Sequence, residues 1–347
     1  MSDQPAQRVF TPPTQPGPDA VADSAPPNPG RIIELSAGYM VAKALFAAVE
    51  FGLFAAAGEN GATPAELAER CGIPERSARA LGDLLADAGL MVRDSGGFRN
   101  AADTELFLSG RGPADLRPLL RYWDQVSYPA WERATEAFRT RRGVRGDLTE
   151  EQTAVYEAAV ASITAETAAD LAREYDFSGH RRVLDVGGGV GTFVAPLLSR
   201  YPHLSATVLD LPEVAVEVAA RAAAGPLAGR LDAVGADFFA DPLPRDHDAI
   251  LVANVVHLFP PDRIAELFGR LREVADADAR LLLVDWWRTD IAPHPSARFG
   301  AGEFLVISGG DLYQVDEVAG WLAETGWRFE RLQPLPPPAG VIVASPA

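Results

Sequence analysis

The sequence has very little of two residue types, and each shortage limits what the protein can be. A single cysteine, Cys71, excludes a disulfide framework or a cysteine metal cluster within the chain, and we expect no metal. A single lysine, Lys43, leaves arginine to carry the remaining positive charge, and the net charge is −17. That balance argues against nonspecific binding to nucleic acid, which depends on basic patches.

Long apolar runs and targeting signals are also scarce. We expect no membrane-spanning helix, because no apolar run approaches the roughly 18 residues that a membrane span needs. The N-terminus lacks the basic and then apolar layout of a signal peptide. These features predict a cytoplasmic protein with no membrane partner, and its 347 residues suffice for one large domain and a smaller one.

The N-terminal part of the chain changes character near residue 31. Residues 1–30 are rich in proline and poor in large apolar side chains, so we expect a disordered tail. Residues 32–54 are apolar nearly all round, which predicts either a buried helix or an interface helix.

The next segment has the outline of a winged helix-turn-helix. Thr63, Pro64 and Glu66 predict a helix start, because they form a capping box with proline at the first helical position. A second helix is expected from about Pro74, and a small hairpin over residues 90–100. Such a module either binds DNA or serves dimerisation. The second helix has three acids against two arginines, which disfavours DNA recognition.

The C-terminal half alternates short apolar strands with helical stretches, after a helical region over residues 113–180. This alternation predicts an α/β domain with a mostly parallel sheet and helices on both faces. The last two strands are separated by only a short break. They are therefore expected to pair as an antiparallel hairpin at one edge of the sheet.

Four glycines stand among the five residues that follow the first of these strands, in VLDVGGGVG. A dinucleotide fingerprint started at Gly187 would need a glycine at Thr192, and a P-loop would need a lysine, so both motifs fail. What remains is an acid before the glycines, Asp185, and further acids where the next two strands end, Asp210 and Asp237. Carboxylates suit a cationic nucleoside such as S-adenosylmethionine better than a phosphate. The alternative is that the acids only cap helices.

The motifs VLDVGGGVGTF, VLDLP and GADFF resemble those of the plant- and actinomycete-type small-molecule O-methyltransferases, which are class I methyltransferases. The resemblance implies a winged-helix dimerisation domain over 31–110 and a helical linker over 111–180 that contributes to the substrate pocket. It also implies a Rossmann-like domain over 181–347 that binds S-adenosylmethionine and yields S-adenosylhomocysteine. The implied cofactor-binding residues are Asp185, Gly187, Gly189, Gly191, Asp210, Leu211, Asp237, Phe238 and Asn254.

His257 follows a strand at the carboxyl edge of the predicted sheet, where ligands bind in such folds. It also matches the position of the family's catalytic histidine. In the family pattern an aromatic residue and then an acid follow this histidine, and here they are Phe259 and Asp262. The family places an acid that orients this histidine at Asp285. Imidazole can accept a proton near neutral pH, so the resemblance implies that His257 is a general base. The alternatives are an ordinary core or surface histidine and, for Asp285, a solvated strand end.

The sequence departs from the family pattern in three places. At the position where the family often has a second acid, this sequence has Leu312, and Asp311 lies one residue before it. A basic residue that meets the cofactor carboxylate is replaced by Ala253, and a methionine near the cofactor is replaced by Val160. The candidate substrate-pocket residues are Trp123, Tyr128, Tyr156, Val160, Trp286 and Phe304, and they predict an aromatic acceptor.

The resulting hypothesis is a homodimeric O-methyltransferase that acts on an aromatic hydroxyl in bacterial secondary metabolism. One alternative keeps the fold and the cofactor but methylates carbon, nitrogen or sulfur, or uses the cofactor without transferring a methyl group. A second alternative is a winged-helix regulator with a degenerate methyltransferase domain. His257 and Asp285 favour the enzyme.

Overall fold

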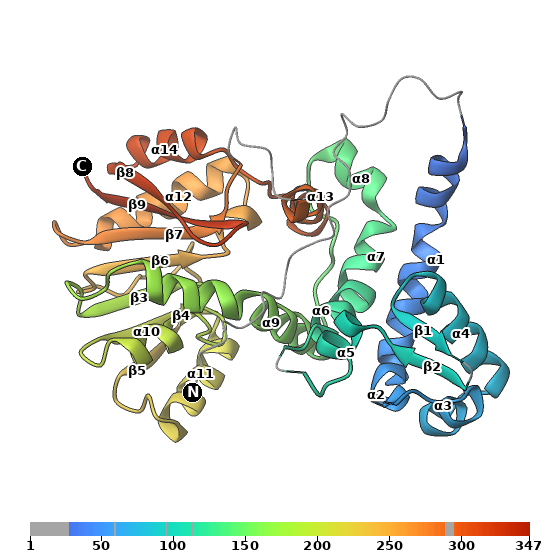
Figure 1. Ribbon diagram of the computed structural model, residues 1–347. Coiled ribbons are helices and arrows are strands. Elements are labelled where there is room, and N and C mark those ends of the chain that lie inside the picture. The colour runs from blue at the N-terminus through green and yellow to red at the C-terminus, as the bar shows by residue number, and fades with distance from the viewer. Residues whose placement is uncertain (1–27, 59, 95, 113, 289–294) are drawn as a thin grey trace. The chain divides into compact units, whose positions relative to one another are not determined.

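The computed structural model describes residues 28–58, 60–94, 96–112, 114–288 and 295–347 (Figure 1). Most of the predicted disordered tail therefore lies outside the described residues. The contacts divide the chain into two compact units. The first runs to Val126 and includes Thr149–Ser162, and the second comprises Ser127–Leu148 and Ile163–Ala347. Domain limits at residues 110 and 180 stay predictions.

The first unit contains the predicted winged helix. Its elements are α1 (Gly30–Glu50), α2 (Leu53–Ala57), α3 (Pro64–Cys71), α4 (Glu75–Asp87), the antiparallel hairpin of β1 (Met91–Asp94) and β2 (Gly97–Asn100), α5 (Ala102–Leu108) and α6 (Arg117–Tyr122). The capping box at Thr63 is present, with Pro64 as the first helical residue. Phe54, Leu67, Leu85 and Phe98 lie in one apolar core. The sequence prediction for this segment is confirmed.

Helix α1 is not the buried helix that was one of the two expectations. Only Phe46, Ala48 and Val49 are buried within the chain, near its C-terminal end. The exposed large side chains on this helix are Ile32, Ile33, Leu35, Tyr39, Met40 and Val41. By length and composition alone, α1 could cross a membrane, so the expectation that no apolar run reaches this length is wrong. An exposed apolar surface of this kind typically marks an interaction site.

The second unit is built on a seven-stranded sheet (Figure 1). In chain order its strands are β3 (Arg182–Val186), β4 (Ser205–Asp210), β5 (Leu231–Gly235), β6 (Ala249–Ala253), β7 (Arg280–Trp286), β8 (Trp327–Pro334) and β9 (Ala339–Pro346). Their spatial order is β5-β4-β3-β6-β7-β9-β8. The first five are parallel, and β9 pairs antiparallel with both β7 and β8. The predicted sheet and its antiparallel hairpin are confirmed.

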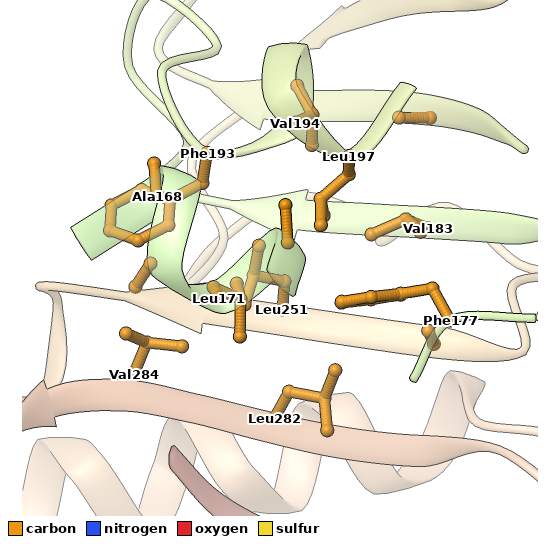
Figure 2. Packing of buried hydrophobic residues seen from close by; sticks show 14 of the residues in the cluster. Ala168, Leu171, Phe177, Val183, Phe193, Val194, Leu197, Leu251, Leu282 and Val284 are labelled. Atoms are coloured by element: carbon orange, nitrogen blue, oxygen red, sulfur yellow. The ribbon is translucent and has the colours of Figure 1, made fainter. Parts of the chain in front are cut away.

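Helices cover both faces of this sheet. One face packs against α10 (Val194–Arg200), α11 (Pro212–Ala224) and the end of α9 (Glu150–Glu174). Figure 2 shows this core, where Leu171 and Phe177 meet Val183, Leu251 and Leu282 of the strands. The other face packs against α12 (Pro261–Val274) and α14 (Val315–Glu324). The strands are apolar because both sides are buried.

The strand order reverses direction between β3 and β6. From β3 the chain moves outward to β4 and β5, and then returns to β6 on the opposite side of β3. A crevice at the carboxyl ends of the strands is the usual ligand site at such a switch point. The glycine loop follows β3 and His257 follows β6, so both motifs lie at this position.

Candidate active site

The glycine loop adopts a backbone that favours glycine. Gly187, Gly189 and Gly191 all have positive φ, of 68°, 53° and 80°, in the left-handed region. A Cβ atom at Gly187 would lie 2.8 Å from a methyl group of Val255, so a side chain would also collide there. The glycines are needed for the path of the loop, which leaves its backbone bare toward a ligand.

Asp210 joins the end of β4 to the glycine loop. One carboxylate oxygen accepts a hydrogen bond from the backbone N–H of Gly189 and the other from that of Leu211, both at 2.8 Å. Burial raises the pKa of Asp210, and these two N–H groups act in the opposite direction. A carboxylate offers about four lone-pair positions, so two remain for ligand hydroxyls such as a ribose diol.

Asp185 is the most deeply buried acid of the site. Its side chain is wholly buried, and neither oxygen has a hydrogen-bond partner among the residues that the structure describes. Burial, together with the negative charge of Asp210, raises the pKa of Asp185 to about 7. A Cβ at Gly188 would lie 2.5 Å from this carboxylate, so the loop lies directly against it. Two neighbouring carboxylates fit a cationic ligand and disfavour a phosphate.

The titration of Asp185 makes the stability of the ligand-free protein depend on pH. Because the pKa is raised in the folded state, the folded protein holds this proton over a range in which the unfolded chain has lost it. The protonated Asp185 side chain therefore contributes to the free energy of unfolding below about pH 4, and this contribution is lost as the pH rises to about 7. We expect Asp185→Asn to be more stable than the wild type at pH 8, by on the order of a few kcal/mol, and nearly equal at pH 4.

Urea unfolding of both proteins at the two pH values measures this effect. The difference between the variant and the wild type removes the contribution of all other titrating groups. An equal difference at pH 4 and pH 8 would show that Asp185 does not titrate in this range.

Asp237 and Phe238 follow β5 in a tight turn. Oδ1 of Asp237 accepts the backbone N–H of Phe239 at 2.8 Å, and its side chain is exposed. Asp237 therefore caps its own turn, as the capping alternative predicts. The Phe238 ring packs against Phe259 with centroids 6.0 Å apart, and it lies 3.7 Å from where a Cβ of Gly187 would be. This apolar surface is suited to a flat base, and a role for both residues toward adenine stays a prediction.

Asn254 directly follows β6 and has a left-handed φ of 56°, which is uncommon outside glycine. Its backbone N–H donates to the carbonyl of Val284 at 2.8 Å. This turn directs the chain from β6 into the short 3-10 helix Val256–Leu258, and so it places His257 beside the end of β7.

His257 and Asp285 form a hydrogen-bonded pair. Nδ1 of His257 lies 2.7 Å from Oδ1 of Asp285, and the backbone N–H of His257 donates to Oδ2 at 3.2 Å. Oδ1 also accepts the backbone N–H of Trp286 at 2.8 Å. The His257 side chain is 12% exposed and that of Asp285 is 1% exposed. An acid that engages Nδ1 fixes the tautomer in which Nε2 can accept a proton.

Aromatic residues lie beside this pair. The ring of Phe304, on α13 (Pro295–Ser308), stacks on the His257 imidazole with centroids 3.8 Å apart and planes at 19°. The ring centroids of Trp286 and Phe304 lie 6.0 Å apart. Of the other predicted pocket residues, Tyr128 belongs to the second unit, whereas Trp123, Tyr156 and Val160 belong to the first. A role for any of the six toward substrate stays a prediction.

The acid missing at Leu312 is not replaced by Asp311 in this structure. Oδ2 of Asp311 accepts a hydrogen bond from Arg141 at 2.8 Å, and Oδ1 lies 3.5 Å from a nitrogen of Arg288. Leu312 is buried. The preceding Gly310 packs so closely that a Cβ there would lie 1.8 Å from the His257 carbonyl oxygen. The turn thus supports the His257 backbone while the Asp311 carboxylate pairs with arginine.

The sequence analysis did not identify two residues that hold the His257 segment. One is Gly310, just described. The other is Tyr313, whose hydroxyl donates to the carbonyl of Phe259 at 2.7 Å. Burial raises the pKa of Tyr313 above its usual range, so the hydroxyl stays protonated and keeps donating. A glycine pair and a tyrosine give no sequence signal for a partner more than fifty residues away.

Comparison with known proteins identifies the family. The model of the O-methyltransferase domain matches residues 137–328, and the model of the O-methyltransferase dimerisation domain matches residues 33–110. The chain is 31% identical over 307 residues to a 3-hydroxy-5-methyl-1-naphthoate 3-O-methyltransferase of Streptomyces sahachiroi, covering 86% of this chain and 89% of that protein. It is 29% identical to a tetracenomycin polyketide synthesis 8-O-methyltransferase of Streptomyces glaucescens, covering 86% and 91%.

A solved structure supports the same assignment. The mitomycin 7-O-methyltransferase superposes with a TM-score of 0.84 at 28% identity, covering 92% of this chain and 97% of that one. No group of three or more potential metal ligands occurs in the described part of the chain. The fold, the carboxylate-lined glycine loop and these matches lead to one assignment. The chain belongs to the O-methyltransferase family and is an S-adenosylmethionine-dependent methyltransferase.

Proposed function

We propose that the protein methylates a hydroxyl group of an aromatic small molecule, with His257 as the general base. The observation that carries this proposal is the 2.7 Å contact between Nδ1 of His257 and Asp285 at the switch point of the sheet. The two curated relatives act on a naphthoate and in tetracenomycin polyketide synthesis, which supports an aromatic acceptor in bacterial secondary metabolism. We place the enzyme in the cytoplasm, where S-adenosylmethionine is supplied.

In this mechanism the bound cofactor supplies a methyl group that its sulfonium already activates. Asp285 holds the Nδ1 proton of His257, so Nε2 receives the proton of the acceptor hydroxyl as the oxygen becomes a nucleophile. The imidazolium that forms is stabilised by the buried Asp285 carboxylate. Phe304 restrains the ring by stacking, and it gives a flat acceptor an apolar neighbour.

At the cofactor end, Asp185 and Asp210 supply the negative charge that suits the ammonium and sulfonium groups. Gly187 and Gly189 allow close approach of the ligand, and Asp210 has acceptor positions for the ribose hydroxyls. Leu211, Asp237, Phe238 and Asn254 complete the proposed cofactor set.

A methyl-transfer assay tests the proposal. The probe acceptor is 3-hydroxy-5-methyl-1-naphthoate, with S-adenosylmethionine labelled on its methyl carbon with ¹³C. We expect S-adenosylhomocysteine to form, and the label to appear at the chemical shift of a methoxy carbon. Label on ring carbon or nitrogen would instead support an alternative transferase activity. Absence of transfer to this probe and to a panel of other naphthols would contradict the proposal.

We further propose that the active form is a homodimer formed through the first unit. Supporting this are the dimerisation-domain match over residues 33–110 and the exposed apolar face of α1. Light scattering is expected to report about twice the chain mass of 37.0 kDa. Leu35→Asp with Met40→Asp should give a monomer, because two buried charges at an interface are costly.

Val216 provides a matched control for this experiment. It is 72% exposed on α11 of the second unit, so Val216→Asp should leave the mass unchanged. A wild-type monomer at micromolar concentration would contradict the proposed dimer.

A further inference from the structure

One short segment of this acidic protein is strongly basic. Residues 133–145 contain five arginines and one glutamate, a net charge of +4, in a chain with a net charge of −17. The segment comprises the whole of α8 (Ala134–Thr140) and the first part of the loop that follows it (Figure 1). The local charge is therefore opposite in sign to that of the whole chain.

Three arginines of this segment are available at the surface, whereas Arg133 pairs with Glu136. Arg139 and Arg142 are exposed, and neither forms an ion pair with any of the residues that the structure describes. Arg141 contacts Asp311 but has a side chain that is 68% exposed. Exposed arginines at this density produce a positive surface potential that attracts acidic groups.

The loop is fixed in place by its backbone. The N–H of Val144 donates to the carbonyl of Val306 at 2.9 Å, and Arg133 donates to the carbonyl of Val144 at 2.8 Å. Arg141 has a left-handed φ of 56°, which a non-glycine residue keeps only where the surrounding structure holds it. A surface held in one conformation loses less entropy on binding than a flexible loop would.

This loop adjoins the support of the catalytic histidine. A Cβ at Gly309 would lie 2.8 Å from the backbone nitrogen of Gly143, and a Cβ at Gly310 would lie 1.8 Å from the His257 carbonyl oxygen. One two-glycine turn therefore contacts both the basic loop and the His257 segment.

Two exposed aromatic rings lie on the neighbouring helices. Phe138 is 57% exposed and Trp131, at the end of α7 (Tyr128–Trp131), is 38% exposed, with ring centroids 6.4 Å apart. Aromatic residues and arginine are the types enriched at protein interfaces and among their energetic hot spots. We name the set Trp131, Phe138, Arg139, Arg141 and Arg142 the arginine surface.

We propose that the arginine surface docks the acidic face of a partner protein that presents the acceptor beside His257. The exposed arginines follow one another along α8 and the loop after it, which favours an extended partner over a single small anion. A protein partner is favoured over a nucleic-acid duplex because the exposed rings of Trp131 and Phe138 lie among the arginines, whereas phosphate contacts need only positive charge. The role in presenting the acceptor relies on the proposed function, whereas the docking itself does not.

Binding of a defined acidic polypeptide tests the docking without any turnover. The probe is fluorescently labelled poly-L-glutamate of about 50 residues, followed by anisotropy at low salt. We expect the wild type to bind it, and the affinity to fall as salt is raised because the interaction is electrostatic. Arg139→Glu with Arg142→Glu should weaken binding at least about tenfold, while S-adenosylhomocysteine binding and methylation of a free naphthol stay unchanged.

The matched control is Arg76→Glu with Arg79→Glu, which reverses two exposed arginines on α4 of the first unit. It should retain the wild-type affinity for the probe. The proposal is overturned by failure of the wild type to bind, by equal loss in the control, or by tighter binding of a 20-base-pair DNA duplex. It is also overturned if Arg139→Glu with Arg142→Glu changes the oligomeric mass, since the surface would then join two copies of the chain.

Discussion

His257→Ala is expected to lower kcat by about 10²–10⁴-fold while cofactor affinity stays nearly unchanged. The reason is that Nε2 is the proton acceptor in the proposed mechanism, and the methyl side chain of alanine cannot replace it. Asp285→Asn should cost less, because it disturbs the orientation of the ring and not its ability to accept a proton. Steady-state rates with saturating S-adenosylmethionine and calorimetry with S-adenosylhomocysteine measure the two quantities separately.

Phe304→Leu is the matched control for this prediction. It removes the ring that stacks on His257 but leaves the imidazole and Asp285 in place, so its kcat should remain well above that of His257→Ala. If His257→Ala keeps more than a tenth of the wild-type activity, either the acceptor is already ionised and positioning alone drives the transfer, or the reaction is not methylation of a hydroxyl group. An acidic phenol compared with a less acidic analogue separates these cases, because only the less acidic one would then need the histidine.

Asp210→Ala is expected to weaken S-adenosylhomocysteine binding by about 1.5–3 kcal/mol, which is roughly a tenfold to 150-fold rise in Kd. The change removes the acceptor proposed for the ribose hydroxyls, and it also releases the N–H of Gly189 that fixes the glycine loop. The affinity of Asp210→Asn for S-adenosylhomocysteine should lie between those of the wild type and Asp210→Ala, since asparagine retains one acceptor oxygen. Calorimetry with the purified variants provides the measurement.

Asp232→Ala controls for the loss of a carboxylate from the same region, since Asp232 is an exposed residue of the neighbouring strand β5. It should bind like the wild type. Unchanged affinity in Asp210→Ala would remove Asp210 from the proposed ribose site, whatever the outcome for His257.

Several elements were predictable because their causes are local. The capping box at Thr63 is satisfied within four residues, and the positive φ angles of Gly187, Gly189 and Gly191 restrict those positions to residues without a side chain. The strands of the sheet are short apolar runs, because both faces of the sheet are buried. Periodicity also predicted the order of helices and strands, from which the parallel sheet follows.

Helix α1 shows where local pattern is not enough. Residues apolar nearly all round favour burial, but the pattern cannot say whether the covering surface belongs to the same chain. In the structure only three residues near the C-terminal end of α1 are buried within the chain. The remaining apolar face is what the proposed dimer would cover.

The sequence by itself determined the family, the cofactor class and the edge of the sheet at which the chemistry belongs, since these depend on motifs that act within one turn or strand. Tertiary structure alone decided how the acids are used. Asp285 reaches His257 across 28 residues because β6 and β7 are neighbours in the sheet, and Asp185 loses every polar partner among the described residues because the strands around it are buried. Asp311 pairs with Arg141, which lies 170 residues away in the chain. The turn at Gly309 and Gly310 brings the two together, because Gly309 packs against the backbone of Gly143 and Gly310 against that of His257. Contacts between side chains so distant in the chain depend on packing, and no local pattern encodes them.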